Sequence, residues 1–95
     1  MIRSFANTNT QTERIWNGLR SKRIAPDVQN RALDKLRMLN RAKTLDDLRN
    51  PPGNRLHDLK DDRAGQHSIS INKQWRICFR FKDGNAYDVE IADYH

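Results

Sequence analysis

The chain has 95 residues, of which 36% are hydrophobic and 32% charged, so it predicts one domain over residues 1–95 with a compact core and a heavily charged surface. It contains no run of about 18 apolar residues, which excludes a membrane-spanning helix. The start, residues 1–5, is too short and too polar for a signal peptide. The single cysteine, Cys78, cannot form an internal disulfide and favours a reducing, cytoplasmic location.

The net charge of +6 is unevenly distributed along the chain. Residues 1–44 carry ten Lys or Arg and three Asp or Glu, whereas residues 45–95 carry eight and nine. A basic half attracts phosphate backbones and acidic proteins through long-range, salt-sensitive forces. A solvated face that keeps the protein soluble explains the charge equally well.

The first half of the chain predicts a short strand followed by a helix. Residues 1–6 alternate between apolar and polar side chains, which is typical of a strand. Turn and capping residues follow, and a helix is expected over roughly 10–20. Its apolar side chains are Ile15, Trp16 and Leu19.

A second helix is expected over roughly 26–42. Pro26 suits the first helical position, where a missing N–H is tolerated, and Asp27 favours the positive end of the helix dipole. One apolar stripe follows the helical period, with Leu33 beside it. The stripe consists of Val28, Ala32, Leu36 and Leu39. Residues 45–48 are compatible with one further turn, and the Pro–Pro–Gly segment at 50–54 ends all helix.

From residue 55 the apolar period changes from 3.6 to 2, which predicts strands. We expect strands over 55–59, 67–71, 75–82 and 86–93, with a turn at 61–65. The fold class is therefore α+β: an N-terminal strand, two helices and an antiparallel β-meander.

The strand register follows from keeping the apolar residues on one face. Three-residue loops at 72–74 and 83–85 achieve this, whereas a two-residue loop at 83–84 exposes one apolar set. The expected pairs are Ile71–Trp75, Ile69–Ile77, Ile77–Ile91, Phe79–Val89 and Phe81–Tyr87. The opposite face then carries polar side chains, remains open to solvent, and places Arg80 opposite Asp88. Its members are Ser68, Ser70, Arg76, Cys78, Arg80, Asp88, Glu90 and Tyr94.

Several short motifs lie in this second half: Leu56-His57-x-Leu59-Lys60, Arg63-x-Gly65, Trp75-Arg76-Ile77-x-Phe79 and the terminal Asp93-Tyr94-His95. With the element order, they make essentially the whole chain resemble the HigB-type branch of the RelE/ParE superfamily of bacterial toxins. The resemblance implies a ribosome-dependent mRNA endonuclease, neutralised by a helix-turn-helix antitoxin, HigA, through which alone the toxin reaches operator DNA. Asp61, where glycine is common, and His67, where an apolar or aromatic residue is usual, depart from the pattern.

The resemblance also implies which residues form the site: His57, Lys60, Arg76, Asp93, Tyr94 and His95. His95 is the first candidate for general acid or base, with His57 as the second and Asp93 as an orienting or alternative base. Arg76 and Lys60 would contact phosphate, and Tyr94 would stack on a base or form a hydrogen bond with it. Each has a structural alternative, such as an idle chain end for His95 or an ion pair with Glu90 for Arg76.

RNA cleavage of this kind needs no metal, because the 2′-OH attacks the adjacent phosphate once a base removes its proton. Histidines titrate near neutral pH and arginine forks suit phosphate, so the chain offers the groups required. Its three histidines and one cysteine show no metal-ligand spacing, and no glycine-rich phosphate loop is present. We therefore expect neither a metal nor a cofactor.

The basic half extends this hypothesis to the ribosome. We expect it to bind ribosomal RNA through Arg20, Lys22, Arg23, Arg31, Arg37 and Arg41. Three alternatives remain open: a gyrase inhibitor of the ParE type, a non-catalytic RNA-binding module, and a degenerate, inactive toxin, which would look much the same in sequence. The same fold hosts the first, although its members tend to lack the terminal Asp-Tyr-His, and the second would tolerate loss of His95.

Overall fold

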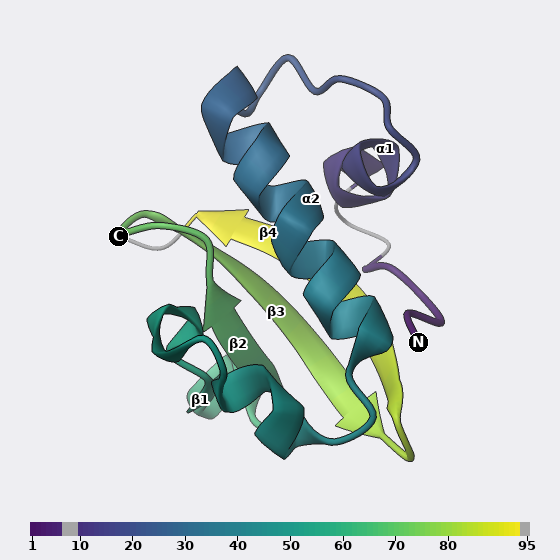
Figure 1. Cartoon of the computed structure of the whole chain (residues 1–95), viewed down its shortest axis with the longest axis vertical. Coiled ribbons are helices and arrows are strands. Elements are labelled where there is room, and N and C mark those ends of the chain that lie inside the picture. The colour runs from purple at the N-terminus through teal and green to yellow at the C-terminus, as the bar shows by residue number, and fades with distance from the viewer. Residues whose placement is uncertain (7–9, 94–95) are drawn as a thin grey trace.

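The computed structural model describes residues 1–6 and 10–93, and it confirms the α+β class (Figure 1). Within these residues, no helix has the length and apolar character needed to cross a membrane. The elements are α1 (Thr10–Trp16), α2 (Pro26–Arg41), the 3₁₀ turns η1 (Leu45–Arg49), η2 (Pro52–Asn54) and η3 (Asp61–Arg63), and the strands β1 (His57–Asp58), β2 (His67–Ser70), β3 (Trp75–Lys82) and β4 (Asn85–Asp93).

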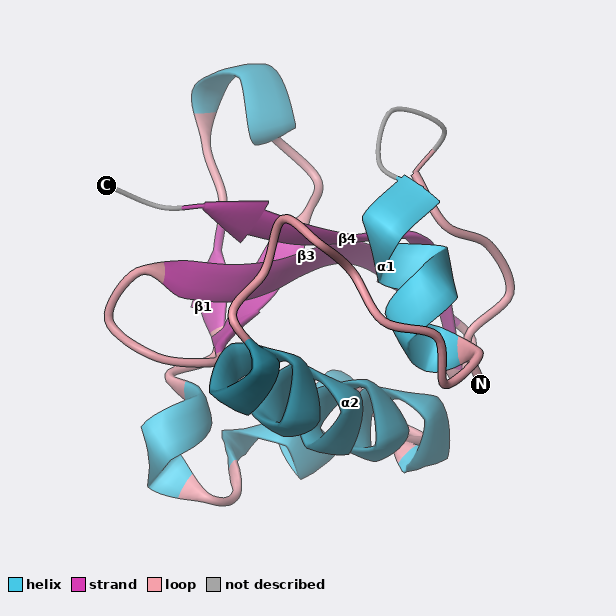
Figure 2. Cartoon of the chain, turned by 90° about the horizontal axis from the view of Figure 1, so that it is seen from above, coloured by secondary structure: helices cyan, strands magenta, loops and turns pink. Residues whose placement is uncertain are grey.

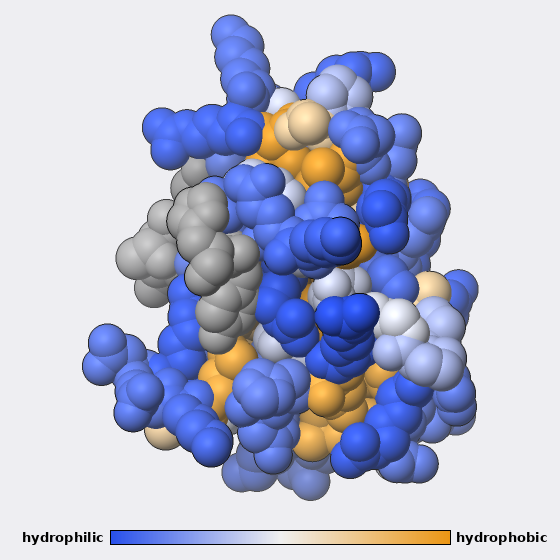
Figure 3. All heavy atoms as spheres, turned by 90° about the vertical axis from the view of Figure 1, so that its left-hand side faces the viewer, coloured by the Kyte–Doolittle hydropathy of each residue, from blue (hydrophilic) through white to orange (hydrophobic). Residues whose placement is uncertain are grey.

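The four strands form one antiparallel sheet in the order β1-β2-β3-β4. Helix α2 crosses one face of this sheet, and α1 lies beside α2 (Figures 1 and 2). We call the face that packs against α2 the inner face and the opposite one the outer face. The core lies between the inner face and α2, and hydrophilic side chains cover most of the side seen in Figure 3, as the composition predicts.

Helix α2 buries the stripe that its sequence predicts. Leu36 and Leu39 are fully buried, and Val28 and Ala32 are buried with them. They pack with Ile69, Ile77 and other apolar side chains of the inner face in one continuous cluster. Because fully burying a leucine side chain contributes about 1.5–3 kcal/mol, this layer holds α2 on the sheet.

Helix α1 ends four residues earlier than expected, because Gly18 terminates it. Gly18 has φ +80°, a left-handed conformation that glycine adopts without strain. The Leu19 N–H donates to the Arg14 carbonyl and the Gly18 N–H to the Ile15 carbonyl, the hydrogen bonds of a Schellman cap. Leu19, expected in this helix, lies beyond the cap and is 52% exposed.

The N-terminal segment lies parallel to β4 and forms two isolated bridges, Ile2–Ala86 and Phe5–Val89. It therefore approximates the expected strand over 1–6, with Ile2 and Phe5 half-buried against the core. The bridges are interrupted where the Ser4 hydroxyl accepts from the Asp88 N–H at 2.9 Å.

The β3–β4 connection differs from the predicted register. It is a two-residue turn in which Asp83 and Gly84 both have positive φ, 51° and 78°, and Phe81 pairs with Ala86. The expected Phe81–Tyr87 pair is therefore wrong. A bulge at Asp88, with φ 53°, puts two β4 residues opposite one β3 residue and restores the expected Ile77–Ile91 pair.

The bulge explains why a two-residue turn does not expose the apolar residues of β4. Before the bulge Ala86 faces the core, and after it Val89 and Ile91 do, all of them buried. Tyr87, expected on the inner face, instead pairs with Arg80. The predicted register requires an unbroken alternation along β4, which the bulge at Asp88 interrupts.

The other strands keep the predicted register. Ile69 pairs with Ile77, and the Ile71 N–H donates to the Trp75 carbonyl at 2.9 Å. Strand β1 is only two residues long rather than five. The expectation of a fully open outer face is wrong at its centre, where Ser68 and Cys78 are completely buried.

Candidate active site

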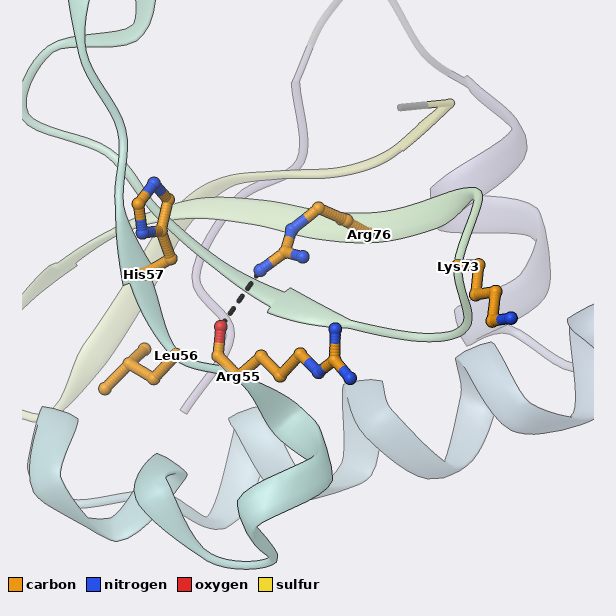
Figure 4. A pocket seen from close by; sticks show the side chains of 5 residues that line it. All are labelled: Arg55, Leu56, His57, Lys73 and Arg76. Atoms are coloured by element: carbon orange, nitrogen blue, oxygen red, sulfur yellow. Dashed lines mark hydrogen bonds between the residues drawn. The ribbon is translucent and has the colours of Figure 1, made fainter. Parts of the chain in front are cut away.

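A cleft of about 570 Å³ opens beside the start of β3. It is lined by Arg55, Leu56, His57, Lys73 and Arg76 (Figure 4). The first three precede or begin β1, Lys73 lies in the β2–β3 turn, and Arg76 projects from β3. We call this the Arg76 cleft. Its size is within the range of about 300–1,000 Å³ typical of small-ligand sites.

Two uncharged oxygens hold the Arg76 side chain at the cleft wall. Its Nε donates to the Ser68 hydroxyl at 2.9 Å, across the β2–β3 pair. One of its terminal nitrogens donates to the Arg55 carbonyl at 2.9 Å, the contact drawn in Figure 4. Neither oxygen carries a charge, so these contacts fix the direction of the guanidinium while it remains a strong cation.

The Arg55 carbonyl is itself fixed. Arg55 adopts φ 47°, a left-handed conformation, and its N–H donates to the Pro52 carbonyl at 3.1 Å. The preceding Asn54 is fully buried and donates to the Leu48 carbonyl at 3.2 Å, while the Lys35 ammonium donates to its side-chain oxygen. The segment that accepts from Arg76 is thereby tied to α2.

His57 lies on the cleft wall because β1 pairs antiparallel with β2, opposite Ser68. Its side chain is exposed and reaches the cleft (Figure 4). The next residue, Asp58, meets the His67 Nδ1 at 2.7 Å, and the His67 ring packs on Phe79 with 5.9 Å between ring centres. This contact joins the two-residue β1 to β2 and so supports the position of His57.

Four implied site residues remain. Lys60 and Asp93 do not line the cleft, and the other two lie outside the described part of the chain. Lys60 is exposed at the N-cap of η3, away from the lining of the Arg76 cleft. Asp93 ends β4 opposite Trp75 and accepts from the Gln74 side chain at 3.2 Å. Tyr94 and His95 lie outside the described residues. The structure thus brings together His57 and Arg76 from the implied set.

Two cations in the Arg76 cleft, Arg55 and Lys73, were missed by the sequence analysis. Nothing in their immediate sequence distinguishes them from solvated surface charges. Only their position in the sequence could have identified them, since each flanks a segment that carries an implied site residue. The register that places Arg76 opposite Ser70 at the end of β2 also brings the 72–74 turn close to it.

The outer face also carries cations that pair with carboxylates. Arg63 contacts Glu90 at 2.8 Å, and Arg80 contacts Asp88 at 3.5 Å as expected. A Cβ atom at Gly65 would lie 2.8 Å from the Arg80 guanidinium, so the glycine permits this close approach. The carboxylate of Glu90 thus pairs with Arg63 rather than with Arg76. Burial raises the pKa of the Cys78 thiol, which lies nearby.

The expected ribosomal-RNA residues occupy two regions. Arg20, Lys22 and Arg23 line a second, larger cleft of about 960 Å³ between α1 and α2, together with Arg14. Arg31, Arg37 and Arg41 are exposed along α2, where Arg37 lies 3.7 Å from Asp34. The Gln29 side chain braces the intervening loop through two hydrogen bonds with the Ser21 backbone, each of 2.9 Å.

Comparison with known structures defines the fold class. YafQ from E. coli superposes with a TM-score of 0.67 over 98% of this chain and 91% of its own, at 14% identity. The YoeB–YefM complex from Staphylococcus aureus gives 0.64 over 100% of this chain and 95% of the matched chain, at 15% identity. At such identities the likeness shows a shared fold alone, the α+β fold of these chains.

Sequence comparison identifies the family within this class. The family of the RelE-like toxin of the type II toxin-antitoxin system HigB matches residues 5–95. The Endoribonuclease HigB of Proteus vulgaris is 37% identical over the full length of both chains. Toxin HigB-1 of Vibrio cholerae serotype O1 is 40% identical over 72 residues, 76% of each chain. The chain belongs to the HigB-like toxin family, and the resemblance noted in its sequence is confirmed.

Proposed function

We propose that this chain is an mRNA endonuclease that cleaves in the ribosomal decoding site and thereby inhibits translation. The observation that carries the proposal is the Arg76 cleft, where a rigidly held guanidinium lies on the same cleft wall as His57. The name of the Proteus vulgaris relative, an endoribonuclease that matches over its full length, supports the same activity.

The chemistry is a metal-independent transfer within the RNA. A base on the protein removes the 2′-OH proton, and the oxygen attacks the adjacent phosphorus. The bond to the 5′ oxygen breaks, a protein acid protonates that oxygen, and the products carry a 2′,3′-cyclic phosphate and a 5′-OH. General acid–base catalysis contributes about 10²–10⁴-fold to such a rate.

We assign the roles as follows. Arg76 stabilises the charge that develops on the phosphorane, and Lys60 holds a phosphate oxygen of the bound strand. His57, Asp93 and His95 share the proton transfers, and Tyr94 stacks on a base. The Ser68 and Arg55 oxygens orient Arg76 before the substrate arrives, which avoids reorganisation during the reaction.

The partners follow from the charge distribution and the family. The basic residues around the α1–α2 loop and along α2 contact ribosomal RNA, while a HigA-type antitoxin neutralises the toxin in the cytoplasm and carries it to operator DNA. Reversing two or three charges among Arg20, Lys22 and Arg23 is expected to weaken ribosome binding and leave the fold intact. Unchanged ribosome affinity across a salt series would rule this surface out.

The test of the activity uses purified protein and a defined mRNA, with and without programmed ribosomes, and primer extension to locate the cuts. We expect cuts only with ribosomes, abolished in His95→Gln and in Arg76→Ala. Cuts without ribosomes would contradict ribosome dependence. An absence of cuts in both cases would refute the nuclease, and a gyrase supercoiling assay would then test the ParE-like alternative.

A further inference from the structure

Two cations in the Arg76 cleft, Arg55 and Lys73, have no role in the chemistry described above. Both residues are exposed, and both line the cleft. Within residues 1–6 and 10–93, no carboxylate lies within ion-pair distance of either one. This distinguishes them from Arg63 and Arg80 on the same face of the sheet, which are both paired.

The backbone holds each of these cations close to Arg76. The Arg55 carbonyl accepts a hydrogen bond from the Arg76 guanidinium. The Arg55 side chain therefore begins next to the catalytic arginine. In Figure 4 the Arg55 side chain runs along the cleft toward Lys73, while His57 lies at the other end with Arg76 between them. Arg55 and Lys73 therefore continue the row of cations from Arg76 in the direction away from His57.

The turn that carries Lys73 is also braced. The Asn72 side-chain oxygen accepts from the N–H groups of Gln74 and Trp75, at 2.8 and 2.7 Å. The Ser70 hydroxyl donates to the Asn72 carbonyl at 2.9 Å. Because the turn is already ordered, binding an anion at Lys73 costs little backbone entropy.

From this arrangement we infer that Arg55 and Lys73 bind backbone phosphates of the RNA next to the phosphate held by Arg76. The inference rests on the proposed function and specifies which part of the substrate the cleft recognises: consecutive phosphates of a single strand, on the side of the cut away from His57. Since these phosphates do not react, the contacts act on affinity and KM rather than on kcat.

The experiment measures binding of a short single-stranded RNA whose cleavage position carries a 2′-deoxy sugar, so that it cannot be cut. Fluorescence anisotropy over a salt series compares the wild type, Arg55→Gln, Lys73→Gln and Lys82→Gln. Lys82 is the matched control, an exposed cation at the other end of β3. Removing one phosphate-binding cation lowers the slope of log K against log salt by about 0.7, so we expect this change in the first two variants and none in Lys82→Gln.

A second arm locates the bound phosphates by replacing single phosphates of the RNA with neutral methylphosphonates. Lys73→Gln is expected to become insensitive to one particular replacement that weakens wild-type binding, and Arg55→Gln to a different one. Equal salt slopes for all variants, or a wild type that binds no RNA at low salt, would overturn the inference.

Cleavage on programmed ribosomes is measured in parallel to separate the two proposals. If the wild type fails to cleave but the slope differences persist, the endonuclease proposal fails and the phosphate contacts stand. If the wild type cleaves and the slopes are equal, the phosphate contacts are refuted and the nuclease stands.

Discussion

The two ends of the outer sheet face use arginine in different ways. At the end near the β3–β4 turn, Arg80 pairs with Asp88 and lies over Gly65, and toward the centre Arg63 pairs with Glu90. At the other end, uncharged oxygens of Ser68 and Arg55 hold Arg76, and the Arg55 and Lys73 side chains line the same cleft. Carboxylates orient the arginines at the first end, whereas a hydroxyl and a carbonyl orient the arginine at the second.

The difference shows that a hydroxyl and a carbonyl can orient the guanidinium of Arg76 through its Nε and one terminal nitrogen. A carboxylate in the place of the Ser68 hydroxyl or the Arg55 carbonyl would compete with a phosphate for the guanidinium. A hydroxyl and a carbonyl accept hydrogen bonds and bring no negative charge of their own. Neutral oxygens thus orient Arg76 in the cleft, whereas carboxylates pair with Arg63 and Arg80.

Breaking the Arg63–Glu90 pair is expected to give the largest change in stability. The Glu90 side chain is only 15% exposed, so Arg63→Gln leaves a poorly solvated carboxylate and lowers the free energy of unfolding by about 1–3 kcal/mol. Urea denaturation measures this decrease, and ribosomal cleavage should be retained. Arg49→Gln is the control, because its pair with Asp46 is exposed and its removal should change stability by less than about 0.5 kcal/mol.

The rate at which the Cys78 thiol is alkylated gives a local measure of the stability lost in Arg63→Gln. Its thiol is buried and its pKa is raised by that burial, so alkylation of the native protein should be slow near neutral pH. Arg63→Gln should speed alkylation by about tenfold for each decrease of about 1.4 kcal/mol in stability. Equal alkylation rates in Arg63→Gln and wild type would show that the pair does not protect the centre of the outer face.

Ser68→Ala should affect catalysis more than stability. The variant removes the hydroxyl that accepts from the Arg76 Nε and leaves the Arg55 carbonyl contact in place. We expect kcat on programmed ribosomes to fall about tenfold with KM little changed, because charge stabilisation in the transition state depends on geometry.

Ser70→Ala is the matched control for this variant. Ser70 is a buried hydroxyl on the same strand, but it donates to the Asn72 carbonyl rather than contacting Arg76. Its removal should lower stability by about 1 kcal/mol and leave kcat unchanged. Similar kcat values for the two alanine variants would mean that Ser68 supports the sheet only.

Removing the charge of Asp88, the bulge residue, is expected to change stability very little. Disturbing its left-handed backbone conformation is expected to change stability more. Asp88→Asn keeps a residue that tolerates φ 53° and removes only an exposed ion pair, so thermal unfolding should change by less than about 0.5 kcal/mol. Asp88→Val places a β-branched residue in the left-handed region and should cost about 1–2 kcal/mol. Equal effects of the two substitutions would show that the left-handed conformation adds no cost beyond the loss of the ion pair.

The layers of this fold were well predicted, because their sequence signals are periodic. The stripe of α2 and the pairing of Ile69 with Ile77 follow from spacing alone. The β3–β4 register could not be found in this way. A single residue in the left-handed conformation, Asp88, reverses the parity of β4, and no local pattern distinguishes it from an ordinary exposed aspartate.

The candidate site was predicted in part for a related reason. Arg76 and His57 came from the family resemblance, and the structure places both on one cleft. Arg55 and Lys73 could not be selected, because their proximity depends on a left-handed residue after η2 and on a braced turn. Both features depend on local backbone conformation and on hydrogen bonds within a few residues, which composition and apolar period do not encode.

Arg76 acts on the substrate in the proposed function, whereas Arg80 forms an exposed ion pair with Asp88. The most direct test measures single-turnover cleavage of mRNA on programmed ribosomes by Arg76→Ala and Arg80→Ala in parallel, with the melting temperature of each. We predict that the rate of Arg76→Ala falls about 10²–10³-fold, as for other preorganised contacts to developing charge, and that Arg80→Ala cleaves within about twofold of the wild type. Equal decreases in the two variants, or a greater decrease in Arg80→Ala, would contradict this division of roles.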